Sequence, residues 1–568
     1  MEAGKRTISD IFNGNRLLEV PFFQRAYVWE DAQWERLLKD MEQITELNKP
    51  YFLGSVILKQ LGTNTESTVG DKRTIIDGQQ RLTTLCIFFK VLCLKNKTNS
   101  TFDRVFRLID NKIAVEHNHN DRDSFEKIMS LESLDAVVSE NTVIKAYNYF
   151  VQYLNPQNID FQKVLSKVMF VVIDLGSEED EQQIFDTINS LGVRLTTAEL
   201  LKNYFFGRNE IKSYEDNWKS IFEKDEETKA FWDREIVAGR QRRETIDLFF
   251  YSFLQIKLQD NLLKVKAEDK KNLGKVEGLF DSYKTFIREY KISKPELIQE
   301  IKNYAIVYKN NIDHDAVENE LPSEYGIERI NAIIFGLDNS TLIPYVLYVL
   351  KNVESEAVRK KIFRYLETYI IRRMICRATN KNYNRLFSEE LISDETLSFE
   401  GLIEVIEKKS DKVNFMPLDE DLEKAFSESV LTNKQAAGII YLIESLIRDR
   451  SKQSTTLLGM NKYSLEHIMP KKWENNWGRL NEEGKIKRNR KLLSLGNLTI
   501  ITSALNSSIR DSNWATKKAG RGDKSGLKQY AAGIETFSPF LDIEVWDESA
   551  IDKRASVLFQ SAKKVYNI

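Results

Sequence analysis

One histidine of this chain stands among residues that could hydrolyse a phosphodiester. His467 follows Glu466 at the end of a predicted strand and precedes Pro470, and Asn497 and Asn506 follow it nine residues apart from each other. A neutral imidazole can take a proton from attacking water, while carboxylate and amide oxygens can hold a hard divalent cation against the scissile phosphate. These residue types therefore indicate metal-dependent phosphodiester hydrolysis, provided that the fold brings them together.

The other three histidines have a plainer context. His117 and His119 lie in the polar stretch EHNHND, and His314 lies in NIDHDA. Both stretches are typical of loops. We expect these three side chains to be exposed and to bind no metal.

A second candidate site lies in the sequence TIIDGQQRLTTL, residues 74–85, where a strand pattern gives way to helical spacing. The start of a helix exposes N–H groups that attract anions. Gly78 lets the backbone approach a ligand, Arg81 can fork onto a phosphate, and Asp77 can hold a cation or orient water. The same turn carries two glutamines, Gln79 and Gln80. Because the chain has no G-x-x-x-x-G-K-[ST] motif, a P-loop ATPase is excluded.

The elements that must position these residues change along the chain. Short strand patterns at 51–59 and 73–77 are mixed with helices, and a further strand is predicted at 170–176, followed by a helix-turn-helix whose second helix begins with a capping box at Thr196 and Glu199. Residues 207–450 are almost wholly helical, and we assign them no chemistry. Beyond residue 454 the predicted order is strand, loop, hairpin strand and helix, with a strand pair at 492–501.

Length and charge indicate several domains of unequal character. A chain of 568 residues is too long for one core, which predicts two to four domains, and 42% hydrophobic with 30% charged residues is typical of a folded protein. The net charge is only −2, but residues 471–530 hold 14 basic against 5 acidic residues. A basic module is therefore attached to an acidic body, as expected of a protein that meets nucleic acid.

The cysteines and the apolar runs indicate a soluble, cytoplasmic protein. The three cysteines form no C-x-x-C pair, so we expect buried thiols in a reducing compartment. The first residues lack the apolar core of a secretion signal, and no stretch approaches the roughly 18 apolar residues needed to span a bilayer.

The C-terminal motifs resemble the ββα-metal (HNH) nuclease motif, in the branch found in GmrSD-type modification-dependent restriction enzymes. The resemblance covers residues 455–530 and rests on EHIMP, LGNLTIITSALNSS and NWATK. It implies that Glu466 and Asn506 are metal ligands, that His467 is the general base and that Asn497 braces the hairpin. It also implies that Lys517 and Arg510 meet phosphate oxygens. An asparagine as the last ligand, where a histidine is usual, favours magnesium or manganese.

The N-terminal motifs resemble the first domain of the same family, a ParB- and sulfiredoxin-like α/β module that hydrolyses nucleoside triphosphates. Besides DGQQR, three segments within the first 205 residues carry the resemblance: VPFFQRAYVWE, YFLGSVIL and FDTINSLGVRLTTAELLKN. The nucleotide-binding residues that it implies are Gln24, Arg25, Asp77, Gly78, Gln79, Gln80, Arg81 and Asn189.

Together these observations predict a mostly helical α+β multidomain protein. The predicted domains are a nucleotide-binding and hydrolysing domain at 1–206, a helical middle at 207–450 and an HNH nuclease at 451–568. The predicted function is a nucleotide-regulated, Mg²⁺- or Mn²⁺-dependent endonuclease that restricts foreign DNA, such as modified phage DNA. Two alternatives stay open, an RNA-cleaving toxin and a nucleotide-dependent binding protein without cleavage. The sequence does not decide the triphosphate, the DNA modification or whether the chain forms a homo-oligomer.

Overall fold

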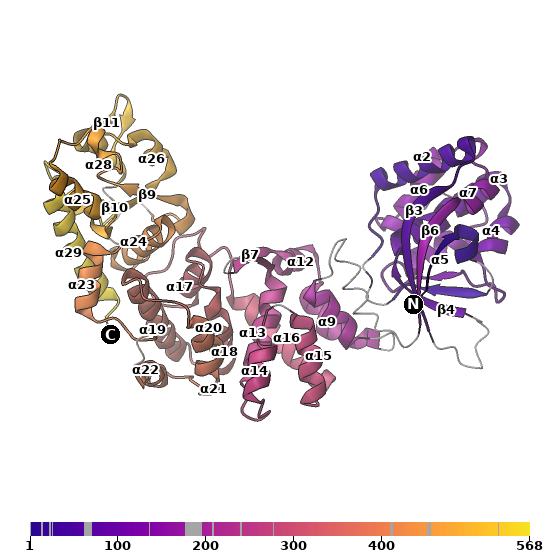
Figure 1. Cartoon of the computed structure of the whole chain (residues 1–568), viewed down its shortest axis with the longest axis horizontal. Helices are drawn as coiled ribbons and strands as arrows, with labels where there is room; N and C mark the ends of the chain where they lie inside the picture. The colour runs from indigo at the N-terminus through magenta and orange to yellow at the C-terminus, as the bar shows by residue number, and fades with distance from the viewer. Residues whose placement is uncertain are drawn as a thin grey trace. The chain divides into compact units, whose positions relative to one another are not determined.

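The computed structural model describes residues 2–12, 15–21, 24, 26–61, 71–135, 137–176, 196–206, 210–238, 241–276, 278–408, 413–449, 451, 456–531 and 533–567. The chain divides into two compact units, Met1–Ile211 and Lys212–Ile568. Helix accounts for 59% of the structure, and the first unit contains a mixed sheet, so the predicted α+β, multidomain and mostly helical class is confirmed (Figure 1). In the described residues, no helix is both long enough and apolar enough to cross a membrane.

A six-stranded sheet forms the centre of the first unit, in the order β1-β6-β3-β4-β2-β5. Its strands are β1 (Glu2–Thr7), β2 (Arg16–Glu19), β3 (Tyr51–Gln60), β4 (Asp71–Asp77), β5 (Val115–Glu116) and β6 (Val168–Leu175). β3 runs parallel to β6 and antiparallel to β4, which in turn runs parallel to β2. The three strands predicted in this part of the chain are therefore confirmed within two residues at either end.

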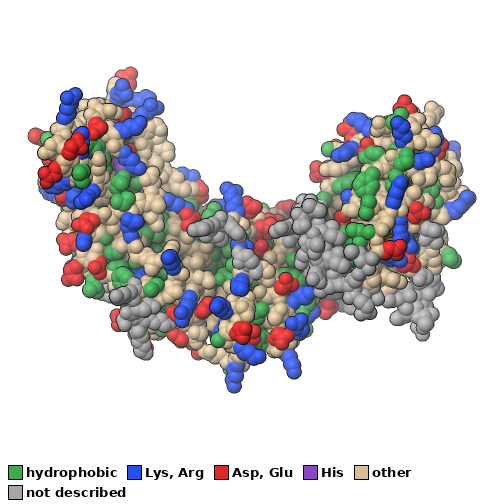
Figure 2. All heavy atoms as spheres, in the orientation of Figure 1, with side chains coloured by type: hydrophobic (Ala, Val, Ile, Leu, Met, Phe, Trp, Pro, Cys, Tyr) green, Lys and Arg blue, Asp and Glu red, His purple; other side chains and the backbone are tan. Residues whose placement is uncertain are grey.

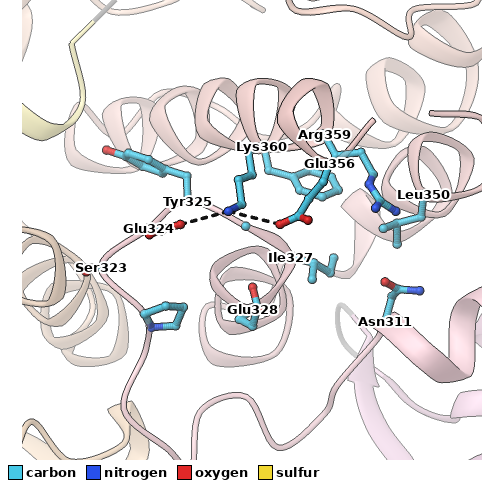
Figure 3. Close-up of a pocket in the computed structure, with 13 residues that line it drawn as sticks. Asn311, Ser323, Glu324, Tyr325, Ile327, Glu328, Leu350, Glu356, Arg359 and Lys360 are labelled. Atoms are coloured by element: carbon cyan, nitrogen blue, oxygen red, sulfur yellow. Dashed lines mark hydrogen bonds and ion pairs between the residues drawn. The ribbon is translucent and has the colours of Figure 1, made fainter. Parts of the chain in front are cut away.

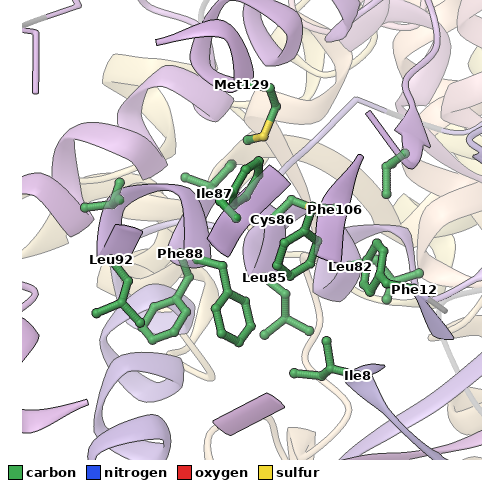
Figure 4. Packing of buried hydrophobic residues seen from close by; sticks show 14 of the residues in the cluster. Ile8, Phe12, Leu82, Leu85, Cys86, Ile87, Phe88, Leu92, Phe106 and Met129 are labelled. Carbon is green, nitrogen blue, oxygen red and sulfur yellow. The ribbon is translucent and has the colours of Figure 1, made fainter. Parts of the chain in front are cut away.

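Helices cover one face of this sheet around a common core. They are α1 (Ile8–Ile11), α2 (Asp31–Leu47), α3 (Gln79–Asn96), α4 (Asn99–Phe106), α5 (Arg122–Ser130), α6 (Thr142–Tyr153), η1 (Pro156–Asn158) and α7 (Phe161–Lys167), and α9 (Thr197–Phe205) follows β6. α3 is buried on nearly every side from Leu82 to Leu94, which is why its sequence is apolar all round (Figure 4). Because α3 packs on the core along most of its length, the position of the turn from β4 into α3 is set by the core. The predicted capping box of Thr196 and Glu199 is confirmed at the start of α9.

The described residues at the start of the second unit are mostly helical and include one short strand pair, β7–β8. Its elements up to residue 447 are α10 (Ile211–Tyr214), η4 (Glu215–Lys219), α11 (Ser220–Phe222), α12 (Glu226–Asp233), β7 (Glu235–Ala238), β8 (Gln241–Glu244), α13 (Thr245–Leu258), α14 (Ala267–Leu273), α15 (Leu279–Glu289), α16 (Lys294–Asn311), α17 (Ile327–Asn331), η5 (Ala332–Gly336), η6 (Ser340–Leu342), α18 (Ile343–Asn352), α19 (Glu356–Ile375), α20 (Tyr383–Arg385), η7 (Leu386–Glu390), α21 (Leu391–Ser393), α22 (Phe399–Lys408), α23 (Asp419–Glu428) and α24 (Asn433–Ile447).

The C-terminal part contains the strand pair β9–β10, here called the β9–β10 hairpin, with helices between and after its strands, and it ends in the long helix α29. The elements are η8 (Met460–Lys462), β9 (Tyr463–His467), η9 (Trp473–Asn475), α25 (Glu482–Lys491), η10 (Leu495–Asn497), β10 (Leu498–Thr502), α26 (Ser503–Ile509), α27 (Trp514–Ala519), β11 (Gly520–Arg521), β12 (Lys524–Ser525), α28 (Leu527–Tyr530), η11 (Ser538–Phe540) and α29 (Glu548–Val565). β9 and β10 pair antiparallel. The strand pair predicted at 492–501 was wrong, because Gly496 and Asn497 form a helical turn that leads into one strand.

The last helix joins the C-terminal part to the helices before it. α29 packs on η10, α23 and α24. The Arg554 guanidinium donates to the carbonyl oxygens of Leu495 and Gly496, both at 2.9 Å. At the other end, the Tyr566 hydroxyl donates to Glu367 at 3.0 Å. The predicted helical middle and the predicted nuclease domain thus lie within one compact unit, and their boundary at residue 450 stays a prediction.

Candidate functional site

The β9–β10 hairpin gathers most of the residues predicted in the C-terminal part. Glu466 pairs with Thr499 and His467 with Leu498 across the two strands. Asn506, on the helix that follows β10, donates from Nδ2 to the Leu465 carbonyl at 3.0 Å and to Ser464 Oγ at 3.1 Å. The amide of Asn506 therefore lies against β9, beside the strand residue that precedes Glu466.

Lys517 is part of the same cluster, but it faces inward. Its side chain is 1% exposed, and its ammonium donates to Glu466 Oε1 and, at 2.8 Å, to the His467 carbonyl. Burial raises the pKa of Glu466 and lowers that of Lys517, while their mutual attraction opposes both shifts. A phosphate contact of Lys517 does not agree with this placement, because the ammonium is occupied and away from solvent.

The imidazole of His467 is only partly covered. Burial, with the nearby cations Lys471 and Lys517, lowers its pKa to about 4. The ring is therefore neutral at physiological pH, which is the form that can accept a proton. Lys471 is exposed, and in the described part of the chain its ammonium makes no ion pair. Sequence reasoning missed this residue, although its position directly after Pro470 in the motif could have pointed to it.

Asn497 is fully buried, and all of its amide is used inside the fold. Its Oδ1 accepts from the Met469 N–H at 2.9 Å and from Trp546 Nε1 at 3.0 Å, and its Nδ2 donates to the carbonyls of Met469 and Leu492, both at 2.9 Å. These contacts tie the segment after His467 to the turn before β10. Asn497 thus supports the hairpin and does not face a substrate.

Arg510 lies at the surface, at the end of α26. Its backbone has a φ of +39°, and its Nε donates to the Ser507 carbonyl at 3.0 Å. The side chain is exposed, so a phosphate contact of Arg510 agrees with its placement.

The predicted cation site offers oxygen ligands of the right kind. In the described part of the chain, Glu466 Oε2 and Asn506 Oδ1 accept no hydrogen bond, and neither belongs to the buried polar atoms that lack a partner, so both reach solvent. No cluster of three or more His, Cys, Asp or Glu residues that could hold a metal occurs among the residues described. The donor set therefore fits a hard cation that keeps several waters, such as Mg²⁺.

The N-terminal candidate site forms where β4 meets α3. Asp77 ends the strand, and Gly78 begins the helix with a φ of +103°. Arg81 donates from Nη2 to the Ser55 carbonyl at 2.8 Å and to Asp77 Oδ2 at 3.0 Å. A Cβ on Gly54 would lie 2.9 Å from Arg81 Nη1, so the glycine makes room for the guanidinium. Asp77 and Arg81 of the DGQQR motif thereby lie together with Gly54 and Ser55 of the YFLGSVIL segment.

The glutamines of this region hold a loop in place. Gln80 accepts from the Val28 N–H at 2.8 Å and donates to the Ala26 carbonyl at 3.3 Å, and Gln24 donates to the Ile76 carbonyl at 3.0 Å. Gln79 is buried at 4% exposure. The structure therefore gives these amides a positioning role at the turn. The predicted residues Arg25 and Asn189 lie outside the described residues.

Two family descriptions match the chain. Residues 8–206 match "GmrSD restriction endonuclease, N-terminal domain", and residues 416–561 match "GmrSD restriction endonucleases, C-terminal domain". The chain belongs to the GmrSD restriction endonuclease family. This confirms the family predicted from the motifs, and it makes the chain a nuclease that restricts foreign DNA. None of the curated proteins matches the chain.

The second GmrSD match begins ahead of the predicted nuclease domain. It includes α23 and α24, and α24 packs on both β9 and β10. The Glu444 carboxylate of α24 accepts from the main-chain N–H groups of Glu535 and Thr536, at 2.9 and 2.8 Å. α24 therefore supports the hairpin that carries Glu466 and His467.

Residues 117–121 form a loop as expected, but the expectation that the side chains of EHNHND are exposed was wrong. His117 is 3% exposed and lies 3.0 Å from Thr83 Oγ1, and burial lowers its pKa to about 3. Asn118 donates to the Gln24 carbonyl at 2.6 Å, and Asp121 accepts from the Tyr27 N–H at 2.7 Å. The stretch is polar because it binds the main chain of the loop beside Asp77 and Arg81, and sequence reasoning missed this role.

The same expectation was wrong for His314. It is 6% exposed and stacks on Phe231, with ring centroids 5.0 Å apart. Burial is the main cause that lowers its pKa, to about 4. His314 is a core histidine of the second unit.

A cavity of about 410 Å³ lies among the helices of the second unit, away from the predicted residues (Figure 3). Lys360 reaches across it to Glu324 at 3.0 Å and to Glu356 at 3.2 Å. The charged side chains that line the cavity largely neutralise each other, and none of the predicted site residues lines it. The cavity therefore gives no reason to move the candidate chemistry away from the hairpin.

Proposed function

We propose that this GmrSD-family chain is a nucleotide-regulated, divalent-metal-dependent endonuclease of the ββα-metal (HNH) type, and that its target is modified phage DNA. One observation carries the nuclease part of the proposal. Asn506 binds the main chain of Leu465 while Lys517 binds Glu466 and the His467 carbonyl, so residues 41 to 51 positions apart converge on the end of β9.

The chemistry follows from the state of each side chain. His467 is neutral, half-buried and open to solvent, so it can take the proton of an attacking water. Glu466 and Asn506 would hold the cation, Mg²⁺ or Mn²⁺, through the oxygens that reach solvent. When bound, such a cation stabilises the negative charge that develops on the phosphate. Lys517 orients the Glu466 carboxylate, and Asn497 fixes the segment that follows the base.

The first unit would bind a nucleoside triphosphate at the start of α3. Among the described residues, Arg81 Nη1 makes no hydrogen bond and does not belong to the buried polar atoms that lack a partner, so the guanidinium retains a donor for phosphate. The first turn of an 18-residue helix adds N–H groups and a positive end. Like a ParB- or sulfiredoxin-type module, this site would hydrolyse the triphosphate and thereby regulate cleavage.

The decisive experiment compares the native chain with His467→Ala on matched modified and unmodified DNA, with Mg²⁺ and each of the four triphosphates. We expect the native chain to cut modified DNA, and the variant to lose about 100- to 10,000-fold in rate while it keeps its DNA affinity. Undiminished cutting by His467→Ala would place water activation elsewhere and refute the assignment.

The same assay separates the alternatives. Selective loss of RNA in a parallel incubation would favour an RNA-cleaving toxin. Turnover of triphosphate without cleavage of any nucleic acid would favour a binding protein. Equal cutting with and without every triphosphate would refute nucleotide regulation but leave the nuclease intact.

A further inference from the structure

A short β-hairpin follows directly from the helix that carries Lys517. β11 pairs with β12, with Gly520 opposite Ser525 and Arg521 opposite Lys524. Gly522 and Asp523 form the two-residue turn, and Gly522 has a φ of +61°. Neither the motifs nor the chemistry of Glu466 and His467 gives this hairpin a role.

Two glycines fix the base of the hairpin. Gly520 has a φ of +104°, and a Cβ on it would lie 1.9 Å from the Lys524 carbonyl oxygen. A Cβ on Gly526 would lie 2.3 Å from the Gly520 nitrogen. Because no larger residue fits at either position, the two strands approach each other more closely than side chains would permit.

The hairpin also packs on the candidate nuclease site. β11 contacts both α26, which carries Asn506, and α27, which carries Lys517. Its position relative to Glu466 is therefore set by the same two helices that complete the cluster at the end of β9.

Two cationic side chains stand on either side of the hairpin turn. Arg521 and Lys524 are exposed, and neither makes an ion pair within the part of the chain that the structure describes. The neighbouring lysines differ, because Lys528 pairs with Asp542 and Lys518 donates to the Ile543 carbonyl. Figure 1 places β11 at an extremity of the C-terminal part, and Figure 2 shows several Lys and Arg side chains there, together with an acidic one.

We propose that the β11–β12 hairpin binds double-stranded DNA beside the cleavage site, and that Arg521 and Lys524 contact phosphates that flank a groove. The DNA major groove admits a two-stranded β-ribbon, and unpaired cations on a rigid support gain most from the polyanion. The hairpin would thus fix the register of the duplex over His467. This inference rests on the proposed function, because it takes the end of β9 as the place of cleavage.

The test measures binding of a DNA duplex to the non-cleaving His467→Ala chain across a salt series. We expect Arg521→Gln with Lys524→Gln to weaken the affinity on the order of tenfold per cation at about 0.1 M salt, and to reduce the slope of log K against log salt by about 2. Arg377→Gln with Lys361→Gln is the matched control, since both residues are exposed and make no ion pair among the described residues. The control should leave affinity and slope unchanged.

A second variant tests geometry without a change of charge. Gly520→Val should distort the hairpin and lower the DNA affinity, while Gly522→Ala, at a position with open space, should have a smaller effect. Native affinity and slope for the DNA duplex in the double glutamine variant would overturn the inference. Failure of the native chain to cut DNA would instead refute the proposed function, so the two failures are distinguishable.

Discussion

The ammonium of Lys517 is held against the carboxylate of Glu466, and both groups are almost completely buried. Lys517 also donates to the His467 carbonyl at 2.8 Å, so one side chain fixes both the Glu466 carboxylate and the main chain of His467. The residue expected to face a phosphate therefore supports the residues that carry the chemistry.

Replacement of Lys517 by methionine should destabilise the second unit. The variant leaves the buried Glu466 carboxylate without its partner, which costs about 3–5 kcal/mol in the free energy of unfolding. Urea unfolding of the full chain measures this loss, and Glu466→Gln with Lys517→Met should recover part of it. Lys528→Met is the control, because that exposed pair with Asp542 contributes at most about 1 kcal/mol. Equal losses for the two lysines would contradict the inward role of Lys517.

Asn497→Ala should disrupt the hairpin more than any exposed asparagine does. It leaves the Met469 N–H, the Trp546 indole N–H and two carbonyl oxygens without partners in the interior. The expected loss is about 3 kcal/mol or more, since each buried group left unpaired costs about 1–3 kcal/mol. Asn476→Ala removes one exposed bond to the Asp511 carbonyl and is the control. A melting temperature of Asn497→Ala equal to that of the control would refute the bracing role.

The turn at Gly78 should tolerate no side chain. A Cβ there would lie 2.8 Å from Val56 Cγ2, and the φ of +103° is itself unfavourable for other residues. Gly78→Ala should therefore lower the free energy of unfolding of the first unit by about 2–5 kcal/mol, the sum of backbone and overpacking costs. Gly278→Ala shares the positive φ but meets open space, so it should lose only about 1 kcal/mol. Similar losses in the two variants would show that contact with Val56 is unimportant.

How far the sequence could predict this structure differs from element to element. The turn from β4 to α3 was predictable. A strand pattern of apolar residues precedes Gly78, a helical spacing follows it, and this glycine adopts a positive φ. β1 was not predictable: its sequence EAGKRT has no apolar alternation, and its partner β6 lies more than 160 residues away. Strand pairing over such a distance depends on packing that a local pattern does not contain.

The candidate sites show the same limit. The structure places Glu466, His467 and Asn506 around the end of β9, whereas the inward direction of Lys517 was not foreseen. Trp514 and Lys517 are three residues apart on one helix, and this shared face could have indicated burial. For EHNHND, polar composition pointed to solvent, but Asn118 and Asp121 bind main-chain groups and His117 lies against the Thr83 hydroxyl, which composition does not reveal.

The burial of His117 should make the first unit sensitive to acid. Its pKa is about 3 in the folded chain and about 6.5 when unfolded, so between these values the unfolded state binds a proton that the folded state does not. The stabilisation by neutral His117 is therefore complete above about pH 6.5, and it falls by about 1.4 kcal/mol per pH unit below that. Hydrogen exchange of the α3 amides from pH 7 to pH 4 measures this loss of stability. His117→Gln should flatten the dependence, whereas His314→Gln, in the second unit, should not change it in α3. An unchanged slope in His117→Gln would mean that other groups cause the acid sensitivity.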